Sequence, residues 1–177
     1  MKKSPGARQQ VIDRLGSYWK MEAGTAVMIP AVMILLSEGQ LGPASYAAMV
    51  PMVLLLAIGG AYWRTKYLRL TKPRHDPLPL FRLLRRLRPF ILALTIAALA
   101  YSILIWLKPD LSAGFNDRVT ATVASTLALA EYINYYHRQL QHFDNMADFK
   151  RLLTGKGFRR SQMAVDLQAV ETSPSAK

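Results

Sequence analysis

The chain of 177 residues carries 23 lysines and arginines against 11 acidic residues, a formal net charge of +12, yet 51% of its residues are hydrophobic. A chain of this length makes one domain. It has no cysteine, which excludes disulfide bonds, thiolate metal ligands and a cysteine nucleophile.

The basic residues are grouped in blocks between long uncharged stretches. This grouping is typical of membrane proteins, in which lysine and arginine flank the apolar segments. A nucleic-acid-binding protein would instead carry its basic residues on an exposed folded surface beside aromatic side chains, so we expect no nucleic-acid partner. The sequence therefore predicts an all-α integral membrane protein.

A basic arm, residues 1–17, precedes the first apolar segment, residues 18–37. The strictly apolar part of this segment is shorter than the ~20 residues that cross a ~30 Å hydrocarbon layer. It spans the layer only if its aromatic and lysine flanks reach the interface. A cleaved signal peptide is the alternative. The long lead-in and the lack of a small-x-small cleavage site favour an uncleaved membrane helix.

Residues 44–63 and 89–107 have the length and composition of two further spans. Pro30 and Pro51 lie inside the first and second segments, where each removes a backbone donor and predicts a kink. Proline-broken membrane helices also line ion or substrate sites in transporters. The similar flanks "VMIPAVMILL" and "AMVPMVLLLA" leave an inverted repeat open as an interpretation, although apolar segments resemble one another by composition.

Residues 79–88 predict an amphipathic interfacial helix before the third span. Leucines recur at i, i+3, i+4 and i+7, at Leu80, Leu83, Leu84 and Leu87, and so line one helical face. We expect the arginines of this stretch to contact the headgroups of anionic phospholipids. These are Arg82, Arg85, Arg86 and Arg88. A calmodulin-like partner or an RNA is the alternative occupant of such a face.

The fourth apolar segment, residues 115–136, contains threonines and a serine. Small residues let membrane helices approach closely, so we expect the third and fourth segments to pack as an antiparallel hairpin through their small side chains. Those side chains are Ala93, Ala97, Ala100, Ala121, Ala124, Ser125 and Ala128.

Beyond the fourth segment, residues 137–160 predict a helical extension into the cytosol. Its apolar residues are spaced three, four and three positions apart, which suits an association seam. The seam consists of Ile133, Tyr136, Leu140 and Phe143. We expect residues 161–177 to be a mostly disordered tail.

The distribution of lysine and arginine predicts the orientation. The N-terminal arm, the loop between the second and third spans, and the C-terminal region are rich in them, whereas the other two loops are not. By the positive-inside rule, four spans then place both termini in the cytosol. We expect a multi-pass protein of the cell inner (plasma) membrane.

Glu131 lies near the cytosolic boundary of the fourth span, where a carboxylate is costly without a partner. At about 100° per residue, Asn134, Tyr135 and Arg138 fall on the same helical face. The predicted orientation places Glu22 and Arg64 at the same depth. We therefore expect these six residues to form a polar cluster. It either ties the helix ends together or handles protons or cations.

Little in the sequence indicates chemistry. His137 and His142 do not face one ion on a helix, and His75 stands alone, so we expect no metal site and no cofactor. No catalytic motif appears, which favours a protein that is not an enzyme.

Three functions follow, in order. The first is association, as an accessory or scaffold subunit or as a homo-oligomer that couples the membrane to a cytosolic partner. The second is a small ion or proton channel or transporter that uses Glu131, Glu22 and the proline-broken helices. The third, a lipid-modifying enzyme, has no constellation of residues to support it.

Overall fold

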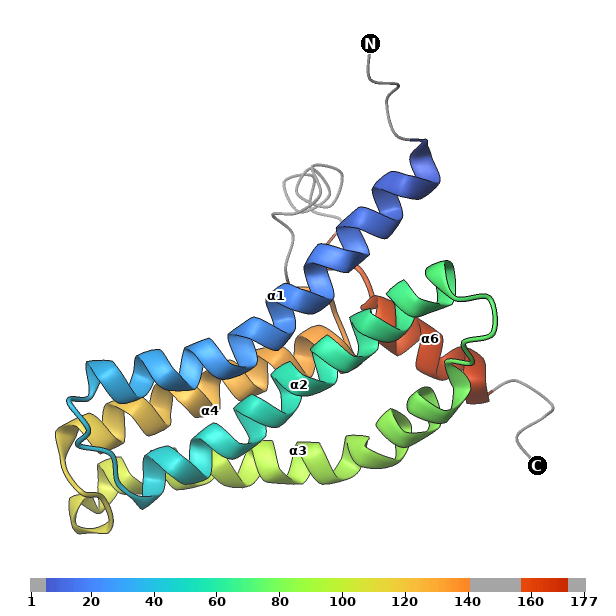
Figure 1. Cartoon of the computed structure of the whole chain (residues 1–177). Helices are drawn as coiled ribbons and strands as arrows, with labels where there is room; N and C mark the ends of the chain where they lie inside the picture. Colours follow the sequence, from blue (N-terminus) through green and yellow to red (C-terminus); the bar gives the residue numbers. More distant parts are fainter. Residues whose placement is uncertain (1–5, 141–156, 172–177) are drawn as a thin grey trace.

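The computed structural model describes residues 6–140 and 157–171, and these are folded into helices without a β-sheet (Figure 1). The long helices are α1 (Ala7–Leu36), α2 (Pro43–Thr71), α3 (Leu78–Leu107) and α4 (Phe115–Tyr136). A short 3-10 turn, η1 (Pro109–Leu111), follows α3, and a helix of 10 residues, α6 (Gln162–Glu171), lies near the C-terminus.

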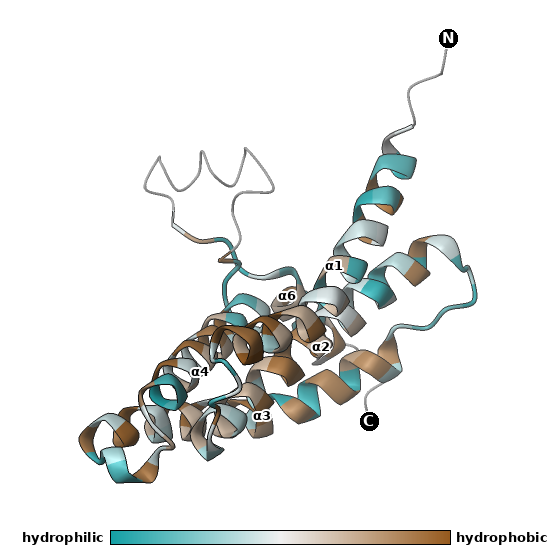
Figure 2. Ribbon diagram, turned by 60° about the vertical axis from the view of Figure 1, so that its left-hand side comes forward, coloured by the Kyte–Doolittle hydropathy of each residue, from teal (hydrophilic) through white to brown (hydrophobic). Residues whose placement is uncertain are grey.

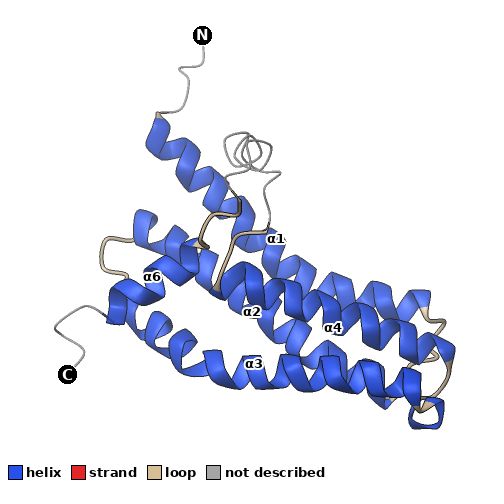
Figure 3. Ribbon diagram, turned by 180° about the vertical axis from the view of Figure 1, so that it is seen from behind, coloured by secondary structure: helices blue, strands red, loops and turns tan. Residues whose placement is uncertain are grey.

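The four long helices form an elongated bundle with α2 at its centre. α2 packs against α1, α3 and α4, and α3 also packs against α4 (Figures 1 and 3). The bundle has two ends. The end that carries α6 is called the α6 end, and the opposite end, at the α1–α2 and α3–α4 connections, is called the Asp117 end.

Three helices are long and apolar enough to cross a membrane: Arg8–Leu36, Pro43–Thr71 and Leu78–Leu107. Figure 2 shows hydrophobic residues along the long helices and hydrophilic residues at the start of α1 and in the α2–α3 loop. In the most apolar window of α2 61% of residues are buried, against 6% in that of α1, so α2 is central and α1 peripheral. The predicted class, an all-helical membrane protein, is confirmed.

The fourth predicted span is a helix but is not among these three. α4 has 22 residues and carries Glu131, Asn134 and several hydroxyl side chains, which make it more polar than the others. It lies alongside α2 and α3. Its small residues Ala121, Ala124, Ser125 and Ala128 are all buried, as predicted for a packing face.

The matching face of α3 was predicted wrongly. Ala93, Ala97 and Ala100 are exposed. Thr95, Ala98 and Ser102 are buried instead, and Ser125 Oγ donates to Ser102 Oγ at 3.0 Å. Helix α3 carries small residues on both faces, so composition alone does not fix its rotation.

Two predicted boundaries were too short because apolar character was used to place the helix ends. α1 begins at Ala7, so most of the arm 1–17 is helical, and α2 continues past residue 63 to Thr71. α2 stops there because Pro73 disfavours helical geometry at Lys72.

Residues 79–88 do not form a separate interfacial helix. They are the start of α3, which runs through Pro89 as one helix. Leu84 is 2% exposed, and Leu80 and Leu87 pack against the core, whereas Leu83 is 50% exposed. The expected leucine face is therefore mostly covered by protein, because α6 packs on this part of the chain.

The predicted helical extension 137–160 is wrong at its start. α4 ends at Tyr136, and Asn134 Oδ1 accepts the N–H of Leu140 at 2.9 Å. An asparagine side chain can compete in this way with helical backbone bonding. The chain then runs antiparallel to the residues before α6, where Gln139 N–H donates to the Arg159 carbonyl at 2.9 Å.

The association seam consequently does not form as predicted. Tyr136 is buried and its hydroxyl donates to the Leu84 carbonyl at 3.3 Å, so it packs inside the protein. Leu140 follows the end of the helix, and Ile133 is partly buried in α4. Phe143 lies outside the described residues.

The tail predicted as disordered contains α6. Ser161 caps it, because Ala164 N–H donates to Ser161 Oγ at 3.0 Å. Met163, Leu167 and Val170 are spaced at i, i+4 and i+7 and are all buried. This spacing is present in the sequence and marks one apolar face of a short helix.

Asp117 fastens the opposite end of the bundle. It is fully buried in the first turn of α4. Its Oδ1 accepts the N–H groups of Gly42 at 2.9 Å and Ser45 at 2.8 Å, and its Oδ2 accepts that of Ala113 at 3.0 Å. The first N–H groups of α2 have no partner within their own helix, so this carboxylate satisfies them and suits the positive end of the helix dipole.

We predict that Asp117→Ala lowers the free energy of unfolding by about 3 kcal/mol or more, because it leaves several buried donors without an acceptor. Asp117→Asn keeps one oxygen and should cost less. Denaturant unfolding in lipid or detergent checks both, with Asp110→Ala, at an exposed carboxylate in η1, as the matched control. Equal stability of Asp117→Ala and Asp110→Ala would contradict the capping role.

Candidate functional site

A buried hydrogen bond joins α1 to α4 near the α6 end. Tyr135 Oη donates to Glu22 Oε2 at 2.8 Å, between residues 113 positions apart. Glu22 is only 6% exposed although it lies on the peripheral helix α1. The bond therefore places a carboxylate of the first helix against the fourth, as the sequence predicted.

Glu131 lies one helical turn before Tyr135 and interacts with it as well. Asn134 Nδ2 donates to Glu131 Oε2 at 3.3 Å. A phenol has one proton, so Tyr135 can donate to only one of the two carboxylates at a time. We call Glu22, Glu131, Asn134 and Tyr135 the carboxylate cluster.

Two glycines of α2 make room for the cluster. A Cβ atom at Gly59 would lie 2.1 Å from Tyr135 Oη, so only glycine leaves space for this hydroxyl. A Cβ atom at Gly60 would lie 3.4 Å from the backbone nitrogen of Ala23, which reflects the close approach of α1. Sequence reasoning missed Gly59, whose role depends on the position of a side chain from another helix.

Two predicted members of the cluster lie elsewhere. The Arg64 guanidinium lies over the Trp19 ring, 5.9 Å from its centroid. Arg138 follows the end of α4, and its Nη1 donates to the Phe158 carbonyl at 3.1 Å. Within residues 6–140 and 157–171 the one salt bridge joins Lys66 to Asp166, so neither carboxylate of the cluster forms an ion pair there.

This arrangement has a specific chemical capacity. Two neighbouring carboxylates in a poorly hydrated site repel each other and favour either a shared proton or a bound cation. In the described part of the chain, no group of three or more histidine, aspartate or glutamate side chains is arranged to hold a metal ion. Proton exchange therefore suits the cluster better than a resident metal.

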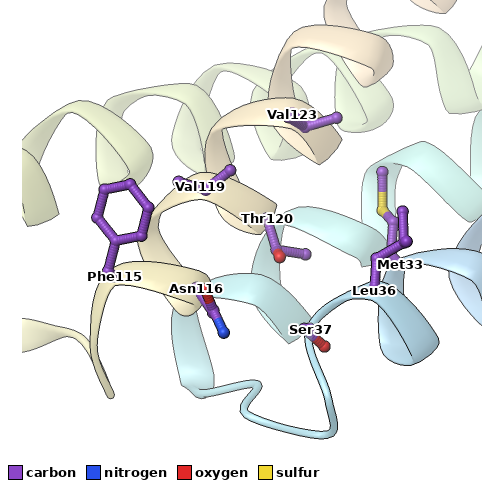
Figure 4. A pocket seen from close by; sticks show the side chains of 8 residues that line it. All are labelled: Met33, Leu36, Ser37, Phe115, Asn116, Val119, Thr120 and Val123. Atoms are coloured by element: carbon purple, nitrogen blue, oxygen red, sulfur yellow. The ribbon is translucent and has the colours of Figure 1, made fainter.

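A groove at the Asp117 end is the larger concavity, with a volume of about 200 Å³ (Figure 4). It lies between the ends of α1 and α4 and is bordered by Met33, Leu36, Phe115 and Val119 together with other mostly apolar side chains. None of its lining residues is ionisable. It has the character of a surface that faces lipid, and we assign no chemistry to it.

The predicted lipid-contacting arginines lie on the outer surface of α3. Arg82, Arg85 and Arg86 are exposed. Arg88 is also exposed, and its guanidinium lies 5.9 Å from the centroid of the Tyr136 ring. These side chains do not contribute to the carboxylate cluster.

No protein family, no curated protein and no solved structure matches this chain. The geometry of the cluster and of the exposed helix faces is therefore the ground on which a function can be proposed.

We predict that Gly59→Ala lowers the free energy of unfolding by about 1–3 kcal/mol, because the added methyl group overpacks the space taken by Tyr135. Gly24→Ala is the matched control. A Cβ atom there would meet nothing within 4 Å, so stability should stay equal or rise by up to about 1 kcal/mol.

Replacing Tyr135 with alanine should remove most of the cost of Gly59→Ala. Unfolding measurements on the two single variants and the double variant check this coupling. A Gly59→Ala variant as stable as Gly24→Ala would show that Tyr135 does not occupy the space above Gly59.

Proposed function

We propose that this chain is a small polytopic protein of the cell inner (plasma) membrane that acts by association. It serves as an accessory or scaffold subunit of a membrane complex, or as a homo-oligomer, and couples the membrane to a cytosolic partner. The α6 end lies in the cytosol in this proposal, because the basic residues of the N-terminal region and of the α2–α3 loop gather there.

The proposal includes α4 as a fourth span. At 1.5 Å per residue, a helix of 22 residues is about 33 Å long, enough for a hydrocarbon layer of ~30 Å. Its polar side chains Asp117 and Ser125 are bonded inside the bundle rather than turned to lipid. This internal bonding makes a less apolar helix tolerable in a membrane.

One face of α1 carries the association proposal. Gly24, Met28, Ala31 and Leu35 lie at i, i+4, i+7 and i+11 and are all exposed, Met28 at 62% and Leu35 at 76%. We call these four residues the α1 face. Gly24 costs roughly 0.5–1 kcal/mol relative to alanine in a helix, and nothing inside this chain requires it. A second transmembrane helix that approaches closely would use such a position.

Anionic phospholipid headgroups are the proposed lipid partner. Arg82, Arg85 and Arg86 present their charges outward from the start of α3, next to the exposed Leu83. Basic residues beside a membrane attract anionic lipids by ~1 kcal/mol each.

We predict that Gly24→Leu dissociates the complex or oligomer, because the larger side chain keeps the partner helix away. Ala97→Leu, on an exposed face of α3, is the matched control and should leave assembly unchanged. Co-purification and the particle mass in lipid nanodiscs measure the effect. A monomeric wild-type protein without a partner, or equal behaviour of the two variants, would refute association through the α1 face.

A second candidate function, a proton or ion channel or transporter, is favoured by the carboxylate cluster. Glu22 and Glu131 share one tyrosine hydroxyl, and both lie in helices of the proposed membrane domain. Groups of this kind inside membranes commonly belong to proton relays.

For this second function we predict that Glu131→Gln and Glu22→Gln each abolish most proton flux into liposomes, because the amide cannot take up and release a proton. Glu38→Gln, at an exposed position near the Asp117 end, is the control. If the wild-type protein supports no flux, the second function is excluded while association is unaffected.

A further inference from the structure

A small cavity lies between α6 and the carboxylate cluster. Its volume is about 40 Å³, room for about one water molecule. Asn134 and Tyr135 of the cluster line one side, and Ser161, Gln162 and Met163 at the start of α6 line the other. The start of α6 is therefore a wall between the cluster and the aqueous side of the α6 end.

Polar contacts fasten α6 to α2 and α4. Asp166 Oδ2 accepts the Tyr62 hydroxyl at 2.6 Å and Lys66 Nζ at 2.8 Å, so one carboxylate holds two groups of α2. Ser161 Oγ donates to the backbone carbonyl of Tyr135. The position of α6 is thereby coupled directly to a cluster residue.

The apolar contacts of α6 are few. Met163, Leu167 and Val170 are buried on the side of the core that includes Phe81 and Leu84 of α3. Burying three side chains offsets much of the entropy lost in ordering a helix of 10 residues, but leaves little surplus. The two hydrogen bonds to Asp166 are therefore decisive for the docked state.

We propose that α6 is a cap that closes the aqueous route to the carboxylate cluster, and that Asp166 holds the cap closed. When Asp166 loses its two donors, α6 lifts from α2 and α3, and water reaches Asn134 and Tyr135 through the opened cavity. The role of the cap in proton flux rests on the second candidate function, whereas the capping itself does not.

The test uses single cysteines, since the chain has none of its own. Met163→Cys reports undocking of α6, and Asn134→Cys reports access to the cavity. Ser102→Cys, buried between α3 and α4, is the control reporter for general loosening. The protein is held in lipid nanodiscs, and the rate of reaction with a water-soluble maleimide is measured for each reporter.

With Asp166 present, the reporters at 163, 134 and 102 should all react slowly. Asp166→Asn should speed labelling at 163 and 134 by about tenfold or more, as expected for the loss of hydrogen bonds to a charged group, and leave 102 unchanged. Tyr62→Phe and Lys66→Gln each remove one donor and should give smaller increases. Asp13→Asn, at an exposed carboxylate of α1, is the control substitution.

Three results would overturn the proposal. These are unchanged labelling at 163 and 134 in Asp166→Asn, an equal increase at all three reporters, and an increase at 163 without one at 134. The first means that apolar contacts alone hold α6, the second that the whole bundle loosens, and the third that α6 leaves without exposing the cluster. None of these readouts depends on association or on proton flux.

Discussion

The arrangement of the bundle depends on the hydrogen bond between Tyr135 and Glu22. A carboxylate buried among membrane-spanning helices is costly unless a donor meets it, so this bond fixes where α1 lies relative to α4. The bond needs space, which Gly59 provides by having no side chain, and Gly60 lets α1 come close to α2. One polar contact thus sets the relation of three helices that apolar packing alone would leave free to slide or rotate.

The two buried acidic sites of the bundle differ in how they are satisfied. Asp117 accepts three backbone N–H groups as well as the Ser45 hydroxyl, so its oxygens have little capacity left and its role is structural. Glu22 and Glu131 share one tyrosine hydroxyl, and Asn134 adds a single donor. Acceptor capacity remains free at the α6 end, which is where a proton or a cation can act. The same residue type therefore fastens one end and offers chemistry at the other.

The sequence predicted the membrane class, three of the spans and four members of the cluster, because long apolar runs and helical spacing report directly on these features. It did not predict the end of α4 at Tyr136, since that depends on the Asn134 side chain meeting the backbone of Leu140. The misplaced Arg138 follows from that error. The rotation of α3 was unpredictable because it has small residues on two faces. The docking of α6 requires Tyr62 and Asp166, 104 positions apart, to meet in space.

The most direct test of this account is the coupling energy between Glu22 and Tyr135, from the unfolding free energies of Glu22→Ala, Tyr135→Phe and the double variant in lipid. A buried hydrogen bond to a carboxyl group predicts a coupling of about 1–3 kcal/mol, so the double variant should lose less stability than the two single losses added together. Additive losses would show that the two side chains do not interact, and would contradict the shared site on which the bundle and its proposed chemistry depend.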